Sequence, residues 1–213
     1  FLSLLALTSA CLQDLAKRAN PVLVSEMSDM DALEVMDTFE AWNDEHGTGR
    51  DDRDYALQLV REMKDDGSAG YALSHASLAA RAAESRGMLG LSHITEAERW
   101  ARRSVDRDSE FRDGAARRML GTIYIFAGKY LPQGDSEEGL ELLEKQVEMY
   151  PEQAANQLRL GEGYLALGDD EEAIAPLCLS QQSKGNLRRE EQKLLKKLLK
   201  DLPEGPASCS VEN

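Results

Sequence analysis

Histidine and carboxylate side chains are the groups of this chain that could bind a metal ion or transfer a proton. The three histidines, His46, His75 and His93, are dispersed, and no two have the spacing that brings two imidazoles to one metal. His75 could line a groove or form a hydrogen bond in the core, and its alanine-rich surroundings favour the core. The acidic residues at 169–172 stand at a helix start, where they complement the helix dipole. Because no nucleophile motif or phosphate-binding loop is present, we expect no enzyme activity, no metal and no cofactor.

The three cysteines suggest lipidation or disulfide formation. Cys11 follows a short apolar run that ends in small residues, as at the end of a bacterial secretory signal, and the run is shorter than the roughly 20 residues that span a bilayer. Residues 1–11 are therefore predicted to be a signal and lipobox remnant, with Cys11 as the lipidation site. The alternative is an amphipathic helix over 1–19 in which Cys11 is a buried apolar residue. Cys178 and Cys209 are not expected to pair, because the first falls among repeat-core residues and the second in a polar tail.

Two copies of one motif indicate which elements position these residues. Leu-Gly-x-x-Tyr occurs at 120–124 and at 160–164, and Gly121 and Gly161 stand 40 residues apart. Small residues that allow two antiparallel helices to approach closely recur in this way in the tetratricopeptide (TPR) hairpin, a unit of about 34 residues. The spacing of 40 residues is longer than this unit. The additional residues fall in a predicted turn over 128–135, where glycine and proline break the helical pattern.

The remaining sequence has the apolar period of helices and no run of alternating β-branched residues. It predicts an all-α chain, a TPR-like solenoid of helical hairpins that form an α–α superhelix, with a C-terminal capping helix whose leucines turn inward. The predicted helices lie over 28–45, 51–64, 71–85, 94–107, two hairpins within 115–150 and 154–183, and the capping helix over 187–202. We expect one domain over 12–202 and a disordered tail over 203–213.

The charge of the chain bears on its partners. The formal net charge is −14, which disfavours nucleic acid as a partner because phosphate binding depends on clustered lysine and arginine. Seven basic and three acidic residues lie between 184 and 202. This local positive charge is interpreted as the solvated face of the final helix rather than as a membrane patch.

The region from 114 to 200 resembles the TPR-type T component of tripartite (TRAP) periplasmic transporters, a family of bacterial lipoproteins. The resemblance rests on Leu120-Gly121-x-x-Tyr124, the extended turn that ends in Gly134-Asp135, and Asn156-x-x-x-Leu160. It implies an α-helical fold that can trimerise, a lipid anchor at Cys11 as the only membrane attachment, and association with a solute-binding subunit or another envelope protein. It also implies a periplasmic location and a small hydrophobic ligand. Without a signal in residues 1–11, the chain would be cytoplasmic.

The TPR pattern and the family resemblance both predict a concave groove, which is the candidate binding site. The resemblance implies that Arg118, Asn156 and Glu162 face it. Placing the two motif copies on the TPR scheme adds apolar and polar residues; the predicted groove residues are Arg118, Thr122, Ile125, Phe126, Asn156, Leu158, Glu162 and Leu165. Such a mixture suits a small amphipathic ligand or an extended peptide. Two alternatives stay open: several of these side chains pack against adjacent helices, or the chain is a general TPR scaffold for a protein partner.

Overall fold

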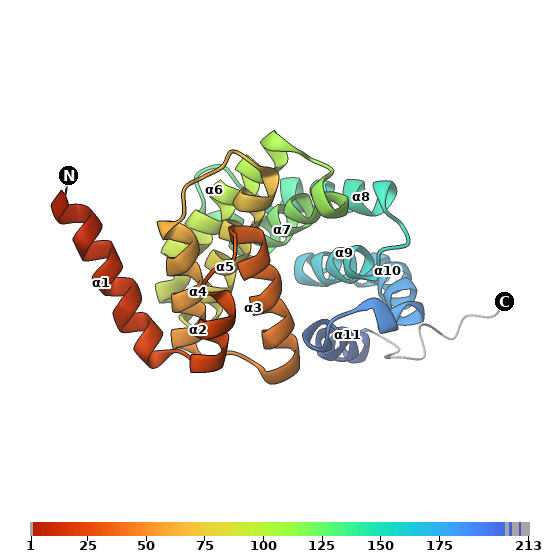
Figure 1. Ribbon diagram of the computed structural model, residues 1–213. Coiled ribbons are helices and arrows are strands. Elements are labelled where there is room, and N and C mark those ends of the chain that lie inside the picture. Colours follow the sequence, from red (N-terminus) through yellow and green to blue (C-terminus); the bar gives the residue numbers. More distant parts are fainter. Residues whose placement is uncertain (1, 203–204, 206–208, 210–213) are drawn as a thin grey trace. The chain divides into compact units, whose positions relative to one another are not determined.

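The computed structural model describes residues 2–202, Gly205 and Cys209, and all of its regular secondary structure over those residues is helical (Figure 1). The prediction of an all-α chain is confirmed. The tail prediction over 203–213 falls outside the described residues except for Gly205 and Cys209. The α-helices are α1 (Leu2–Arg18), α2 (Pro21–Met27), α3 (Ala32–His46), α4 (Arg50–Glu62), α5 (Ala69–Glu84), α6 (Leu91–Arg107), α7 (Phe111–Ala127), α8 (Ser136–Met149), α9 (Ala154–Leu167), α10 (Asp170–Gln182) and α11 (Arg189–Asp201).

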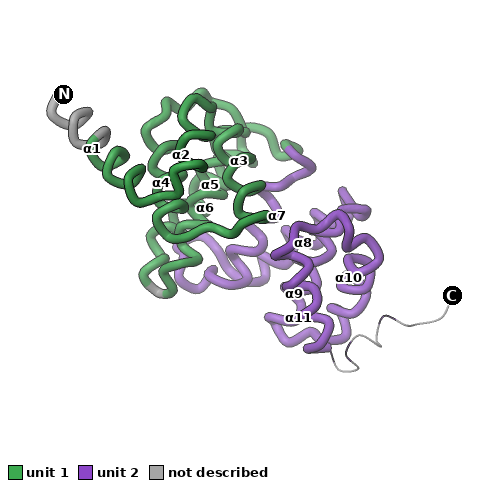
Figure 2. Tube along the Cα trace, turned by 60° about the horizontal axis from the view of Figure 1, so that its bottom comes forward, with its two compact units in different colours: residues 1–111 green, residues 112–213 purple. Residues whose placement is uncertain are grey.

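The chain forms two compact units, residues 1–111 and 112–213, which Figure 2 shows in different colours. The domain predicted over 12–202 is thus spread over both units. The division falls in the first turn of α7, where Arg112, Asp113 and Gly114 have φ angles of 51°, 53° and 70°. This left-handed backbone interrupts the helix, so that the regular part of α7 begins at Ala115.

In the first unit, α5 contacts α3, α4 and α6. Its alanine-rich sequence suits this central position, because alanine lets neighbouring helices come close on several sides. The helix α2 was not predicted. Pro21 occupies its first turn, where a missing N–H costs nothing, and the Asn20 side chain accepts a hydrogen bond from the Val22 N–H.

The N-terminal helix α1 packs on α4. Leu15 is buried, as the alternative of an amphipathic helix expected. Cys11 is exposed and has a free thiol, so the part of that alternative that buried Cys11 is wrong. Within the described residues, no helix is both long enough and apolar enough to cross a bilayer.

The two predicted motif copies have the same packing in two hairpins of the second unit. In the α7/α8 hairpin, a Cβ atom added to Gly121 would lie 2.7 Å from Leu143 Cγ. In the α9/α10 hairpin, a Cβ atom added to Gly161 would lie 2.5 Å from Leu177 Cγ. Both distances are too short for any side chain, so each glycine marks a point where the second helix of its hairpin meets the first.

A second contact, a side-chain hydrogen bond to a carbonyl near the start of the first helix, recurs in hairpins of both units. Ser180 Oγ of α10 donates a hydrogen bond to the Ala154 carbonyl at the start of α9, over 3.0 Å. Ser104 Oγ of α6 donates to the Ala69 carbonyl at the start of α5, also over 3.0 Å. In the α7/α8 hairpin, Gln146 is the equivalent residue. Its side-chain amide donates to the Asp113 carbonyl. In three hairpins, a side chain of the second helix therefore binds a carbonyl near the start of the first helix.

The predicted turn over 128–135 consists of a short 3₁₀ helix (Gly128–Tyr130) and a loop that leads to α8. The loop packs closely on the end of α7, because a Cβ atom at Gly134 would lie 2.3 Å from Tyr124 Cδ1. The Asp135 side chain then caps α8 by accepting a hydrogen bond from the Glu138 N–H. The extra residues of this hairpin are thus held in place by a ring contact and a helix cap.

The last helix, α11, packs its leucines on α9 and α10, as predicted from their spacing. Leu195, Leu198 and Leu199 are buried in one cluster with residues of both helices and with Leu187, which precedes α11. Leu194 packs against the edge of this cluster. The basic side chains at Lys193, Lys196, Lys197 and Lys200 are exposed. The interpretation of this segment as an amphipathic helix with a solvated basic face agrees with this packing.

Cys178 of α10 and Cys209 form a disulfide, with their Cα atoms 5.2 Å apart. The expectation that these cysteines would not pair was wrong. It assumed that residues beyond Pro203 do not return to the helices, whereas Cys209 packs against the leucine cluster of α11. Cys178 is also only half-buried, so its thiol can reach a partner at the surface of α10.

Candidate binding site

Two of the predicted groove residues bind each other. Arg118 of α7 donates a hydrogen bond from Nη1 to Oδ1 of Asn156 in α9, over 2.7 Å. Burial lowers the pKa of the Arg118 guanidinium, and the negative charge of Glu191 partly counters that effect. Asn156 also donates from Nδ2 to the Tyr150 carbonyl over 3.1 Å. The asparagine therefore joins α7 to the turn between α8 and α9.

Burial separates the predicted groove residues into two groups. Asn156 is 1% exposed and Leu158 is 0% exposed, so these two side chains pack against neighbouring helices, as one of the alternatives proposed. Leu165 is half-buried against the leucine cluster of α11. Phe126, near the end of α7, is 51% exposed, and it is the predicted groove residue that is most available to a ligand or partner.

The remaining predicted residues are half-buried, and two of them have partners inside their own helix. Thr122 donates its hydroxyl hydrogen bond to the Arg118 carbonyl, one turn earlier in α7. Glu162 forms an ion pair with Arg159 in α9, over 2.7 Å. A Cβ atom added to Gly163 of α9 would lie 3.0 Å from Ile125 Cδ1. Arg118, Asn156 and Ile125 are thus the predicted residues that connect α7 with α9.

The histidines do not come together. His46 stacks on Trp42 with ring centroids 4.4 Å apart, and His93 is half-buried, with its pKa lowered by burial. His75 is buried in the core between α5 and α6, as its surroundings predicted. In the part of the chain that the structure describes, no group of histidine, cysteine and acidic side chains could hold a metal ion.

His75 belongs to a buried polar cluster that the sequence did not indicate. Its Nε2 lies 2.8 Å from Glu96 Oε1, and its ring stacks on Trp100 with centroids 4.3 Å apart. Arg61 of α4 donates hydrogen bonds to both oxygens of the same carboxylate. Burial alone would raise the pKa of Glu96, but the hydrogen bonds from His75 and Arg61 outweigh it and lower the pKa to about 2.

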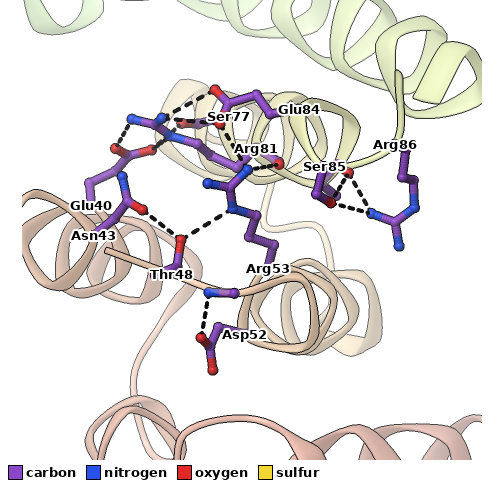
Figure 3. A network of polar contacts seen from close by, with 12 residues as sticks. Glu40, Asn43, Thr48, Asp52, Arg53, Ser77, Arg81, Glu84, Ser85 and Arg86 are labelled. Atoms are coloured by element: carbon purple, nitrogen blue, oxygen red, sulfur yellow. Dashed lines mark hydrogen bonds and ion pairs between the residues drawn. The ribbon is translucent and has the colours of Figure 1, made fainter. Parts of the chain in front are cut away.

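A second network joins α3, α4 and α5 (Figure 3). Arg81 of α5 donates to both oxygens of Glu40 in α3, over 2.9 and 2.7 Å. Arg81 and Arg53 of α4 both bind Glu84. Arg53 also reaches Thr48, whose hydroxyl donates to Asn43 over 2.5 Å. Because each charge faces an opposite charge on another helix or one turn away, the network fixes helix positions and offers no free acid or base.

The contacts in these two clusters hold neighbouring helices together. No protein-family model matches the chain, and no curated protein matches it.

Proposed function

We propose that this chain is a non-catalytic binding scaffold built from TPR-like helical hairpins, with α11 as the helix that covers the last hairpin. The observation that carries the proposal is the recurrent packing of the three hairpins α5/α6, α7/α8 and α9/α10. The α7/α8 and α9/α10 hairpins each place a glycine where their two helices cross. In all three hairpins, a side chain of the second helix donates a hydrogen bond to a carbonyl near the start of the first helix. Repeated hairpins of this kind present the first helices of successive repeats as one surface for a partner.

The proposed role is that of an envelope-associated adaptor of the T-component type, with a solute-binding subunit as the partner and a small hydrophobic ligand in the groove. The disulfide between Cys178 and Cys209 favours an oxidising compartment such as the periplasm. The apolar run before Cys11 favours the same location, with the thiol of Cys11 as the lipid acceptor. A general TPR scaffold for an extended peptide or another protein is the second candidate, and the exposure of Phe126 fits either.

Intact-mass analysis tests the proposed compartment. The complete gene product, isolated from a Gram-negative host under non-reducing conditions, is expected to carry one disulfide and a lipid-sized mass increase on Cys11. Cys11→Ala should lose the lipid and keep the disulfide, whereas Cys178→Ala should lose the disulfide and keep the lipid. Free thiols at both Cys178 and Cys209, together with an unmodified Cys11, would place the chain in a reducing compartment and rule out the envelope location.

Site-specific photo-crosslinking tests the partner. A photoreactive phenylalanine analogue at position 126 in α7 is expected to capture the solute-binding subunit. The same analogue at Leu179 in α10, which is 47% exposed, serves as the control and is expected to capture none. Capture of a second copy of the chain at position 126 would instead indicate a homo-oligomer through this face. Capture of another envelope protein at position 126 would favour the general TPR scaffold. Equal capture at both positions would contradict the groove.

A further inference from the structure

A cavity of about 340 Å³ lies at one end of the first unit, where α3 and α5 begin and α6 ends. Its volume is at the lower end of the range that small-molecule sites occupy. It is open to solvent, and its lining shares no residue with the predicted groove. None of the motifs in the sequence pointed to it. Its lining combines an apolar floor with three carboxylates, and this combination indicates the class of ligand that it fits.

The floor consists of Leu33, Gly70, Tyr71 and Phe111. A Cβ atom added to Gly70 would lie 3.4 Å from Leu33 Cδ2 and 3.4 Å from Phe111 Cζ, which is ordinary van der Waals contact. Helix packing therefore does not require glycine here, in contrast to Gly121, where the same atom would lie 2.7 Å from Leu143. Glycine in a helix costs about 1 kcal/mol relative to alanine. At Gly70 it leaves open the space between two apolar side chains.

The carboxylates belong to Asp31, Asp66 and Asp108. Asp31 accepts backbone hydrogen bonds from Leu33 and Glu34, and Asp108 accepts one from Glu110. Asp66 accepts hydrogen bonds from the backbone and the side chain of Ser68. None of the three is in an ion pair with a described residue, whereas the adjacent Asp65 is paired with Arg107 over 2.7 Å. Hydrogen bonds from Ser68 lower the pKa of Asp66, which is therefore ionised at neutral pH.

We propose that this cavity binds a linear aliphatic polyamine. Its ammonium groups would bind the three carboxylates, none of which forms an ion pair with a described residue. Its methylene segments would lie on Leu33, Gly70 and Phe111. A metal ion would bind the carboxylates but would not contact the apolar floor. An uncharged lipid would contact the floor but would leave the carboxylates without a cation. An alkyl chain with ammonium groups makes both kinds of contact. This site is separate from the groove of the proposed function, and neither proposal depends on the other.

Calorimetric titration of the full chain with spermidine tests the proposal. We expect saturable binding of one spermidine per chain at low salt. Asp66→Asn and Asp108→Asn should each weaken binding about fivefold, the size of one screened charge contact. Asp169→Asn, which removes an exposed carboxylate in the second unit, is the matched control and should bind as the wild type does. Gly70→Leu should abolish binding by filling the cavity, while its circular dichroism spectrum stays unchanged.

Three outcomes would overturn the polyamine site. The first is equal weakening by Asp169→Asn and Asp66→Asn, which would show attraction by net charge alone. The second is displacement of spermidine by Mg²⁺ at equal concentrations of charge, which would show that the alkyl chain contributes nothing. The third is unchanged binding in a folded Gly70→Leu variant. If Gly70→Leu fails to fold, Phe111→Ala removes one wall of the floor and is expected to weaken binding about tenfold, by loss of apolar contact; unchanged binding to Phe111→Ala would equally overturn the site.

Discussion

Gly139→Ala is expected to destabilise the chain by about 2 kcal/mol, although alanine is the better helix former. A Cβ atom at Gly139 would lie 2.9 Å from the Gly121 carbonyl oxygen and 2.9 Å from the Ile125 backbone nitrogen. Backbone atoms of α7 cannot rotate away as a side chain can, so α8 must move as a whole. Overpacking of this kind costs roughly 3 kcal/mol, and the gain in helix propensity offsets about 1 kcal/mol.

Urea unfolding followed by circular dichroism measures this effect. Gly185→Ala is the matched control, because a Cβ atom there meets nothing within 4 Å and the backbone is not left-handed. It should change the free energy of unfolding by less than about 0.5 kcal/mol. A Gly139→Ala variant as stable as the control would mean that α7 and α8 do not approach as closely as the repeat motif requires, and the proposed TPR-like packing would lose its main support.

The hairpins were predictable because close helix approach leaves a direct mark on the sequence. Wherever two backbones come together only glycine or alanine fits, so the spacing of Gly121, Gly139 and Gly161 reports the crossings themselves. Leucine spacing in α11 reports a buried face in the same way, and its packing on α9 and α10 agrees with that pattern. Both signals are local, because the residues that carry them lie within one or two helices.

The disulfide and the ion-pair networks were not predictable, because they depend on where distant residues come to lie. Cys178 and Cys209 are 31 residues apart, and Arg81 meets Glu40 across 41 residues. Neither pair has a spacing that distinguishes it from the other cysteines or charges of the chain. The face of a helix that is exposed to solvent is similarly hard to predict from the sequence where two helices cross. The groove prediction accordingly included Leu158, which is fully buried.

Glu96→Gln is expected to lower the free energy of unfolding by roughly 3 kcal/mol at pH 7. Glutamine keeps the size of the side chain, but it removes the charge that His75 and Arg61 face in the core of the first unit. The pKa of Glu96 is lowered from 4.5 to about 2, and each pKa unit corresponds to about 1.4 kcal/mol of preference for the charged form. The side chain is 13% exposed, so solvent screens these contacts little.

The pH dependence of this loss distinguishes the charge from the shape of the residue. A carboxyl group with a lowered pKa stabilises the folded state fully above its ordinary pKa, and the contribution disappears as pH falls through the folded-state value. The difference in unfolding free energy between wild type and Glu96→Gln should therefore be constant from pH 7 to about 5 and shrink toward zero near pH 2. Glu141→Gln, on the exposed face of α8, removes the same charge and should show a small difference throughout. A Glu96→Gln loss that stays constant down to pH 2 would mean that the cluster depends on hydrogen-bond geometry alone, and the ionised carboxylate would then have no role in holding α4, α5 and α6 together.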